Sequence, residues 1–108
     1  MIKATFYKDK EKESYSGFKI KGHSGYAESG SDIVCASVSS MVMLFLNTAL
    51  SIYSPAHDLN TDEKTACIEF KLKNFDENVS KLLECLYACI ESVSEEYSAF
   101  VKVSEMVS

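Results

Sequence analysis

Two residues early in the chain carry side chains that could act together in covalent catalysis. Cys35 supplies a thiol, and His23 supplies an imidazole twelve positions earlier. A thiolate attacks carbonyl carbon, and a neighbouring imidazole can accept the thiol proton at neutral pH. This spacing alone is weak evidence, because a single cysteine or histidine is more often a structural residue. The interpretation therefore depends on the elements that carry the two side chains.

The thiol lies where a helix is expected to begin. Ser31 and Asp32 are both typical N-cap residues, and an apolar segment follows, which predicts a helix over 32–51. Cys35 then falls in the first turn, where free N–H groups and the helix dipole favour a negative charge on sulfur and can hold an oxyanion. His23 lies at the end of an expected strand, before a glycine-bearing loop that can fold back over the helix.

The remaining pattern predicts an α+β fold in which two helices pack on a mostly antiparallel sheet. An apolar stripe at helical spacing predicts a second, acidic helix over 76–98. Alternating apolar and polar residues predict strands over 2–8 and 15–21, a hairpin over 56–72 with its turn at 60–64, and a last strand over 99–104. The element order is ββαββαβ, and the absence of an internal linker predicts a single domain over 1–108.

Composition and charge limit the classes of function. The net charge of −5, from 11 basic and 16 acidic residues, argues against direct nucleic-acid binding and suits a basic protein substrate. The N-terminus lacks a signal-peptide pattern, and polar residues interrupt the apolar stretch over 33–50, so no membrane contact is expected. We expect a cytoplasmic protein that uses no cofactor and keeps its four cysteines as thiols, with no metal site. Cys85 and Cys89, four apart on the second helix, are expected to be buried packing residues.

The first predicted helix has no polar side over 41–46. A helix that is apolar all round is either fully buried or shared with a partner, and a chain of 108 residues offers little material to bury it. We therefore expect a homodimer formed through the helix over 32–51. The alternative is that the second helix and a loop cover it within one chain.

A longer run of residues around Cys35 and His23 is more specific than their spacing. The run reads Gly22-His23-Ser24-Gly25-Tyr26-Ala27, followed by Gly30-Ser31-Asp32-Ile33-Val34-Cys35-Ala36-Ser37-Val38-Ser39. Together with the chain length, the order of elements and the acidic second helix, it closely resembles the ribosomal-processing cysteine protease family. No departure from the family's motif stands out.

The resemblance implies a function for the whole chain. Family members remove a short N-terminal extension from a protein of the large ribosomal subunit, at a motif with paired aromatic residues, and they form homodimers. The family's nucleophile corresponds to Cys35 and its base to His23. In this chemistry His23 accepts the thiol proton and passes it to the leaving amine, while Cys35 forms a thioester that water hydrolyses.

Several neighbouring residues leave alternatives open. Asp32 is expected to cap the helix, and orientation of the imidazole is the alternative. Ser39, one turn after Cys35, either supports the site through a hydrogen bond or bonds its own helix backbone.

We expect the glycine-bearing loop that follows His23 to be mobile when empty and to close over the substrate, with a plain surface loop as the alternative. Its residues expected near the substrate are Gly22, Ser24, Gly25, Tyr26, Gly30 and Ser31.

Two other classes of function compete with the protease interpretation. One is a non-catalytic, ribosome-associated module that binds a protein through its sheet or its apolar helix. The other is a thiol hydrolase that acts on a small ester or amide. Only the two hydrolase interpretations require the Cys35 thiol, so its replacement by alanine separates them from the binding module.

Overall fold

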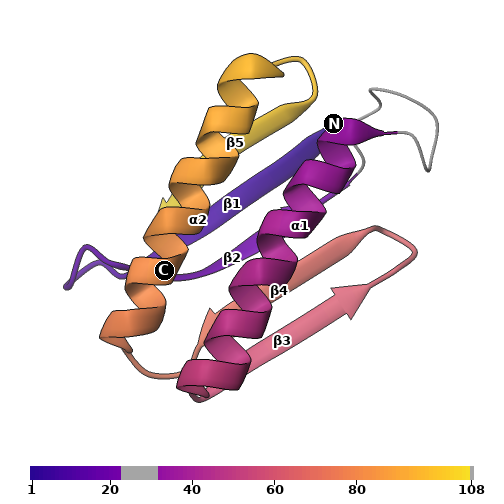
Figure 1. Ribbon diagram of the computed structural model, residues 1–108. Helices are drawn as coiled ribbons and strands as arrows, with labels where there is room; N and C mark the ends of the chain where they lie inside the picture. Colours follow the sequence, from indigo (N-terminus) through magenta and orange to yellow (C-terminus); the bar gives the residue numbers. More distant parts are fainter. Residues whose placement is uncertain (23–31, 108) are drawn as a thin grey trace.

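Two helices cover one face of a five-stranded sheet in the computed structural model, which describes residues 1–22 and 32–107 (Figure 1). This arrangement confirms the predicted α+β class and the order ββαββαβ. The elements are β1 (Ile2–Lys8), β2 (Tyr15–Lys21), α1 (Ile33–Thr48), η1 (Ala49–Tyr53), β3 (His57–Asp62), β4 (Cys67–Leu72), α2 (Glu77–Glu96) and β5 (Val101–Val107). The segment η1 continues α1 as one wider, π-helical turn.

The strands lie in the order β3-β4-β2-β1-β5, and every neighbouring pair is antiparallel except β1 and β5, which are parallel. The register aligns Phe6, Phe18 and Phe70 across the three central strands. All three side chains are fully buried and face the helices. Because side chains alternate along a strand, the residues between them point to the opposite, uncovered face of the sheet.

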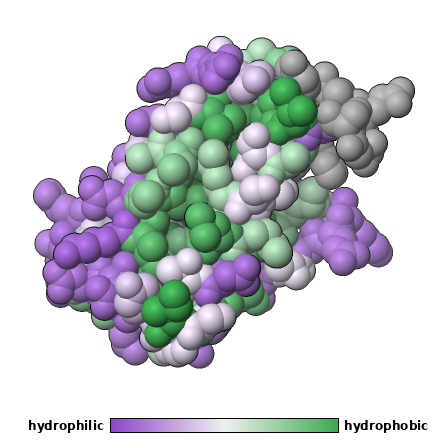
Figure 2. All heavy atoms as spheres, viewed as in Figure 1, coloured by the Kyte–Doolittle hydropathy of each residue, from purple (hydrophilic) through white to green (hydrophobic). Residues whose placement is uncertain are grey.

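The helices complete the core with residues spaced three or four positions apart, as an amphipathic helix requires. Helix α1 buries Val34, Val38, Val42 and Phe45, and helix α2 buries Val79, Leu83, Leu86 and Ile90. The two helices differ on their outer sides. The outer side of α2 is mostly polar, whereas α1 exposes Leu44 and Met43, which are 70% and 59% accessible. Figure 2 accordingly shows apolar surface gathered over the helices and hydrophilic surface around its margin.

By length and composition, the segment Ile33–Tyr53 would be able to cross a membrane, although polar residues interrupt it. The same segment supplies Val38, Val42 and Phe45 to the core. Moving this segment into a bilayer would expose the buried phenylalanines of the sheet to water. The apolar residues on its inner side are therefore explained by packing against the sheet.

Candidate active site

Asp32 caps the helix that carries the candidate nucleophile. Its backbone is extended, with φ −77° and ψ 100°, and its Oδ1 atom accepts hydrogen bonds from the backbone N–H groups of Val34 and Cys35, each at 3.0 Å. The expected capping role of Asp32 is therefore confirmed, and Cys35 lies in the first turn as predicted. The other candidate cap, Ser31, lies outside the described residues.

This cap changes the expected supply of oxyanion donors. Asp32 occupies the N–H groups of Val34 and Cys35 through its side chain, and its backbone carbonyl accepts the N–H of Ala36 at 3.1 Å. Among the described residues, the Ile33 N–H is the only donor of this turn that makes no hydrogen bond. The expectation that several free N–H groups could hold an oxyanion is thus narrowed to Ile33.

The cap and the catalytic interpretations of Asp32 predict different results for two substitutions. We expect Asp32→Ala to lower the free energy of unfolding by about 1 kcal/mol, because it removes the cap, whereas Asp32→Asn retains most of the stability because Asn also caps helices. If capping is the whole role, Asp32→Asn also retains most of the cleavage rate. Urea unfolding and cleavage rates measured on both variants test this. A stable but inactive Asp32→Asn protein would show that the carboxylate orients the imidazole instead.

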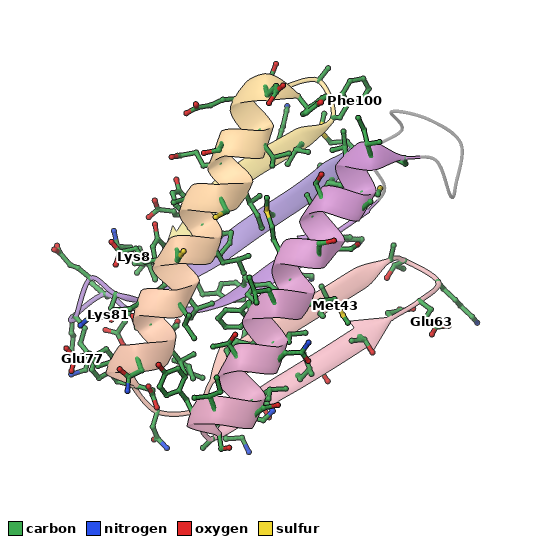
Figure 3. The ribbon with its side chains drawn as sticks, viewed as in Figure 1. Lys8, Met43, Glu63, Glu77, Lys81 and Phe100 are labelled. Atoms are coloured by element: carbon green, nitrogen blue, oxygen red, sulfur yellow. The ribbon has the colours of Figure 1, made fainter. Side chains whose placement is uncertain are left out.

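The Cys35 thiol is half-exposed and lines a cavity of about 340 Å³ at one end of the sheet. One wall is formed by α1 and the other by the sheet and the β3–β4 turn. The lining is mainly apolar, from Ile2, Ile20, Val38, Val42, Met43, Leu46 and Ile68. In Figure 3, Met43 extends from α1 toward the β3–β4 hairpin, and Glu63 lies at the turn of that hairpin. A cavity of this size and lining is typical of a binding site for an apolar side chain.

Gly22 fixes the end of β2 at the edge of this cavity. Its φ is +97°, and a Cβ atom at this position would lie 2.5 Å from the carbonyl oxygen of Met1. Its N–H donates a hydrogen bond to the carbonyl of Ala66 at 3.1 Å, which links β2 to the β3–β4 turn. Gly22 and Cys35 line the same cavity, so the residue that precedes His23 is held beside the candidate nucleophile.

The imidazole of His23 lies outside the described residues, as do Ser24, Gly25, Tyr26 and Gly30. The predicted pairing of His23 with Cys35 and the predicted closure of the loop therefore stay predictions. What the structure contributes is the placement of the flanking residues Gly22 and Asp32, which carry the two ends of this segment to the described part of the site.

Ser39 lines the cavity one turn after Cys35. Within residues 1–22 and 32–107 its hydroxyl makes no hydrogen bond, so the alternative of a bond to its own helix backbone is not formed. Ser37 makes that kind of bond instead, donating from Oγ to the carbonyl of Ile33 at 2.8 Å. The supporting role of Ser39 toward the site stays a prediction.

Sequence reasoning missed the residues that β3 and β4 bring to the cavity. Thr61, Asp62, Glu63 and Cys67 line it from the hairpin and place two carboxylates at one end. Asp62 Oδ1 accepts the N–H of Lys64 at 2.9 Å, which holds the turn. The acidic turn was visible in the sequence, but its position opposite α1 follows from strand pairing that no local pattern specifies.

Cys85, Cys89 and the second histidine, His57, do not line this cavity. The His57 Nδ1 atom lies 2.8 Å from the carbonyl of Pro55, and its ring stacks on Phe70, so it is structural as expected. Cys85 and Cys89 are exposed, and the expectation that they are buried was wrong, because they line the open groove between α1 and α2 rather than the core. Desolvation of the sulfur and the neighbouring Cys85 raise the pKa of Cys89. The described residues contain no cluster of three His, Cys, Asp or Glu able to hold a metal ion.

A half-exposed thiol in the first turn of a capped helix, facing an apolar cavity at the end of a sheet, is a site for a cysteine hydrolase. The class is confirmed and narrowed by sequence comparison. The family model for the cysteine protease Prp matches residues 1–102, and the chain belongs to this family. It is a cysteine protease.

Individual relatives agree with this assignment. The ribosomal processing cysteine protease Prp of Bacillus subtilis is 28% identical over 109 residues, which cover 96% of each chain. That of Staphylococcus aureus is 26% identical over 88 residues, covering 79% of this chain and 81% of the relative.

Two solved structures show the same fold. The S. aureus Prp structure with a covalently linked product peptide superimposes with a TM-score of 0.91 at 20% identity, over 98% of this chain and 100% of that one. The structure of SMU.848 from Streptococcus mutans gives a TM-score of 0.82 at 29% identity, over 100% and 96% of the two chains.

Proposed function

We propose that this protease removes an N-terminal extension from a protein of the large ribosomal subunit, acting in the cytoplasm. The observation that carries the proposal is the half-exposed Cys35 thiol in the first turn of α1, at the edge of an apolar cavity that Gly22 also lines. Curated relatives are named ribosomal processing cysteine proteases, and a structure of the S. aureus relative holds a substrate peptide.

The proposed mechanism uses His23 and Cys35 as a pair. His23 accepts the proton of the Cys35 thiol, and the thiolate sulfur attacks the scissile carbonyl carbon. The C–N bond breaks, His23 returns the proton to the leaving amine, and a thioester to Cys35 forms. Water then hydrolyses the thioester, so the reaction balances with water alone and needs no cofactor.

The cavity suits the kind of substrate that this function requires. Its apolar walls can take an apolar side chain close to the scissile bond, and Asp62 and Glu63 place negative charge at its far end. Ribosomal proteins are basic, and a basic segment beside the cut would meet these carboxylates. The hairpin end of the cavity therefore favours an extended chain that is apolar on one side of the cut and positively charged nearby.

The direct test is cleavage of a purified large-subunit ribosomal protein that carries its N-terminal extension. Mass spectrometry of the products should show one cut that releases the extension, and a precursor with a scrambled cleavage motif should stay intact. Binding of the precursor without any cut would favour the non-catalytic module instead. Cleavage of small esters alone would favour a thiol hydrolase that acts on small substrates.

We further propose that the enzyme is a homodimer and that α1 forms the interface. Helix α1 contains no charged residue over Ile33–Thr48, and its exposed Leu44 borders a shallow groove against α2 that is also lined by Met41 and Leu82. A two-fold contact of α1 with a second copy would bury these apolar side chains without desolvating any charge of α1. The absence of charge on both sides of such a contact favours a second copy over a charged partner.

Leu44→Glu should convert the dimer to a monomer, because two-fold symmetry brings two buried carboxylates together. Sedimentation velocity measures the change. Val107→Glu is the matched control, since Val107 is 63% exposed and lies on β5, away from α1. A wild-type protein that sediments as a monomer at micromolar concentration would contradict the proposal.

A further inference from the structure

The uncovered face of the sheet carries a concentration of positive charge. On β1, β2 and β5, the side chains that point away from the helices include Lys3, Lys19, Lys21 and Lys102, all exposed, and no acidic residue. The acidic residues lie mainly elsewhere, and α2 alone carries Glu77, Glu84, Glu91, Glu95 and Glu96. The net charge of −5 therefore conceals two surfaces of opposite sign.

Three of these lysines are aligned across neighbouring strands. Lys3 pairs with Lys21 of β2 on one side and with Lys102 of β5 on the other. Neighbouring strands lie about 4.8 Å apart, and like charges directly opposite each other destabilise a sheet. We refer to Lys3, Lys21 and Lys102 as the lysine ladder.

Nothing in the described part of the chain neutralises the lysine ladder. The ion pairs of residues 1–22 and 32–107 involve other lysines, namely Lys8, Lys73 and Lys81. On the neighbouring strand β4, Glu69 pairs with Lys19, not with a member of the ladder, and accepts the hydroxyl of Tyr7. The ladder thus lowers the stability of the isolated chain, which is expected where an anionic ligand supplies the missing charge.

We propose that the lysine ladder binds the phosphate backbone of RNA. Lysine ammonium groups are strong point-charge partners of phosphate, and the neighbouring hydroxyls of Thr5 and Ser104 can donate to phosphate oxygens. A protein partner fits less well, because the centres of protein interfaces are depleted of lysine and enriched in aromatic residues. The contacts are to backbone only, so the binding should depend little on RNA sequence.

The ladder lies at the same end of the sheet as the cavity. Lys21 immediately precedes Gly22, and the paired residues of β1 and β5 lie beside it. An RNA seated on the ladder would therefore run past the end of the sheet where Cys35 lies. This placement would present a substrate that is already bound to RNA, a consequence that rests on the proposed function, whereas RNA binding itself does not.

The test compares two triple variants with the same change in net charge. Lys3→Gln/Lys21→Gln/Lys102→Gln removes the ladder, and Lys10→Gln/Lys64→Gln/Lys81→Gln removes three lysines from other surfaces. Fluorescence anisotropy with a labelled 20-nucleotide single-stranded RNA is measured over a range of salt concentrations. Three phosphate contacts predict a slope of about −2 for log K against log salt in the wild type. We expect the ladder variant to bind at least about 10-fold more weakly at low salt with a slope near zero.

The control variant should bind within about 3-fold of the wild type, since distant charges are screened. Equal losses in both variants would show only non-specific attraction and overturn the proposal, as would the absence of wild-type binding. Preference for vesicles of anionic lipid, or for polyglutamate, over RNA would assign the surface to another class of partner and overturn it too.

Three further measurements separate this proposal from folding and from catalysis. The ladder variant should melt at a higher temperature than the wild type at low salt, because like-charge repulsion is removed. It should cleave a free peptide at the wild-type rate, so loss of RNA binding and loss of the proposed function are distinguishable. Lys3→Gln/Lys102→Gln, which leaves Lys21 beside Gly22 unchanged, should give a smaller loss of RNA affinity in the same direction.

Discussion

Cys35→Ala should lower the cleavage rate of a peptide substrate by at least about 10⁴-fold, since the proposed thioester forms on the Cys35 sulfur. The fold should survive, because Cys35 is half-exposed and its backbone N–H remains available to Asp32. We expect the free energy of unfolding to stay within about 1 kcal/mol of wild type. Single-turnover cleavage assays and urea unfolding of the same preparation measure both quantities.

Cys67→Ala is the matched control for this experiment. Cys67 is also half-exposed and lines the same cavity, but it lies on β4 rather than at a helix N-terminus. Its replacement should change the rate by less than about 3-fold, because a strand offers no comparable field for a thiolate. Equal losses in the two variants would mean that the cavity shape, and not the Cys35 sulfur, carries the reaction.

Gly22→Ala should impair both stability and cleavage. A left-handed φ costs an L-residue about 1–2 kcal/mol, and the added Cβ would also press on the Met1 carbonyl, so we expect a loss of about 2–3 kcal/mol in unfolding free energy. Movement of this residue would shift the start of the segment that carries the proposed base, His23. The value of kcat/KM should fall by at least about 10-fold even below the melting transition, because small displacements of catalytic groups are costly.

Gly17→Ala gives the comparison that separates stability from catalysis. A Cβ at Gly17 would lie 2.2 Å from the carbonyl oxygen of Phe70, so this change should also destabilise the sheet. Gly17 lies near the start of β2 and does not line the cavity. Its variant should therefore keep a near-normal kcat/KM at temperatures where it is folded. A Gly22→Ala enzyme with wild-type kcat/KM would show that the end of β2 does not position the site.

The fold was predictable because each element carried an independent local signal. Alternation placed β1, β2 and β4, and the Asp32 cap together with the apolar segment placed α1. The errors occurred at the ends of strands and helices, whose positions are set by hydrogen bonds in the adjoining turns. The last strand was predicted over 99–104 but spans Val101–Val107, because the N–H groups of Phe100 and Val101 both bond the Tyr97 carbonyl in a closing turn. The parallel pairing with β1 then carries it to Val107.

Similar local effects moved two other boundaries. The turn of the second hairpin was expected at 60–64, but β3 continues to Asp62 and the turn occupies 63–66, where Ala66 has a φ of +50°. The helix expected over 32–51 ends as regular α-helix at Thr48 and widens into η1, which Ser54 terminates in a left-handed conformation. An alanine or serine in that conformation is uncommon, so composition gave no sign of either ending.

The site was predictable only in part, for a physical reason. Asp32 and Cys35 are neighbours in sequence, and helix capping is a local interaction that a short motif encodes. The cavity joins α1 to β2 and the β3–β4 turn, and these contacts depend on the register of strands far apart in the chain. The charge pattern of the lysine ladder was hidden for the same reason, since its three members come from three strands.

The contact between Met1 and Gly22 has a practical consequence for handling the enzyme. Residues joined before Met1 would start within a few ångströms of the site, so an affinity tag placed there should obstruct peptide entry. Because β5 runs parallel to β1, residue 107 lies beside Lys8 at the opposite end of the sheet, and Figure 1 places the two chain ends far apart. Purification tags therefore belong after the last residue.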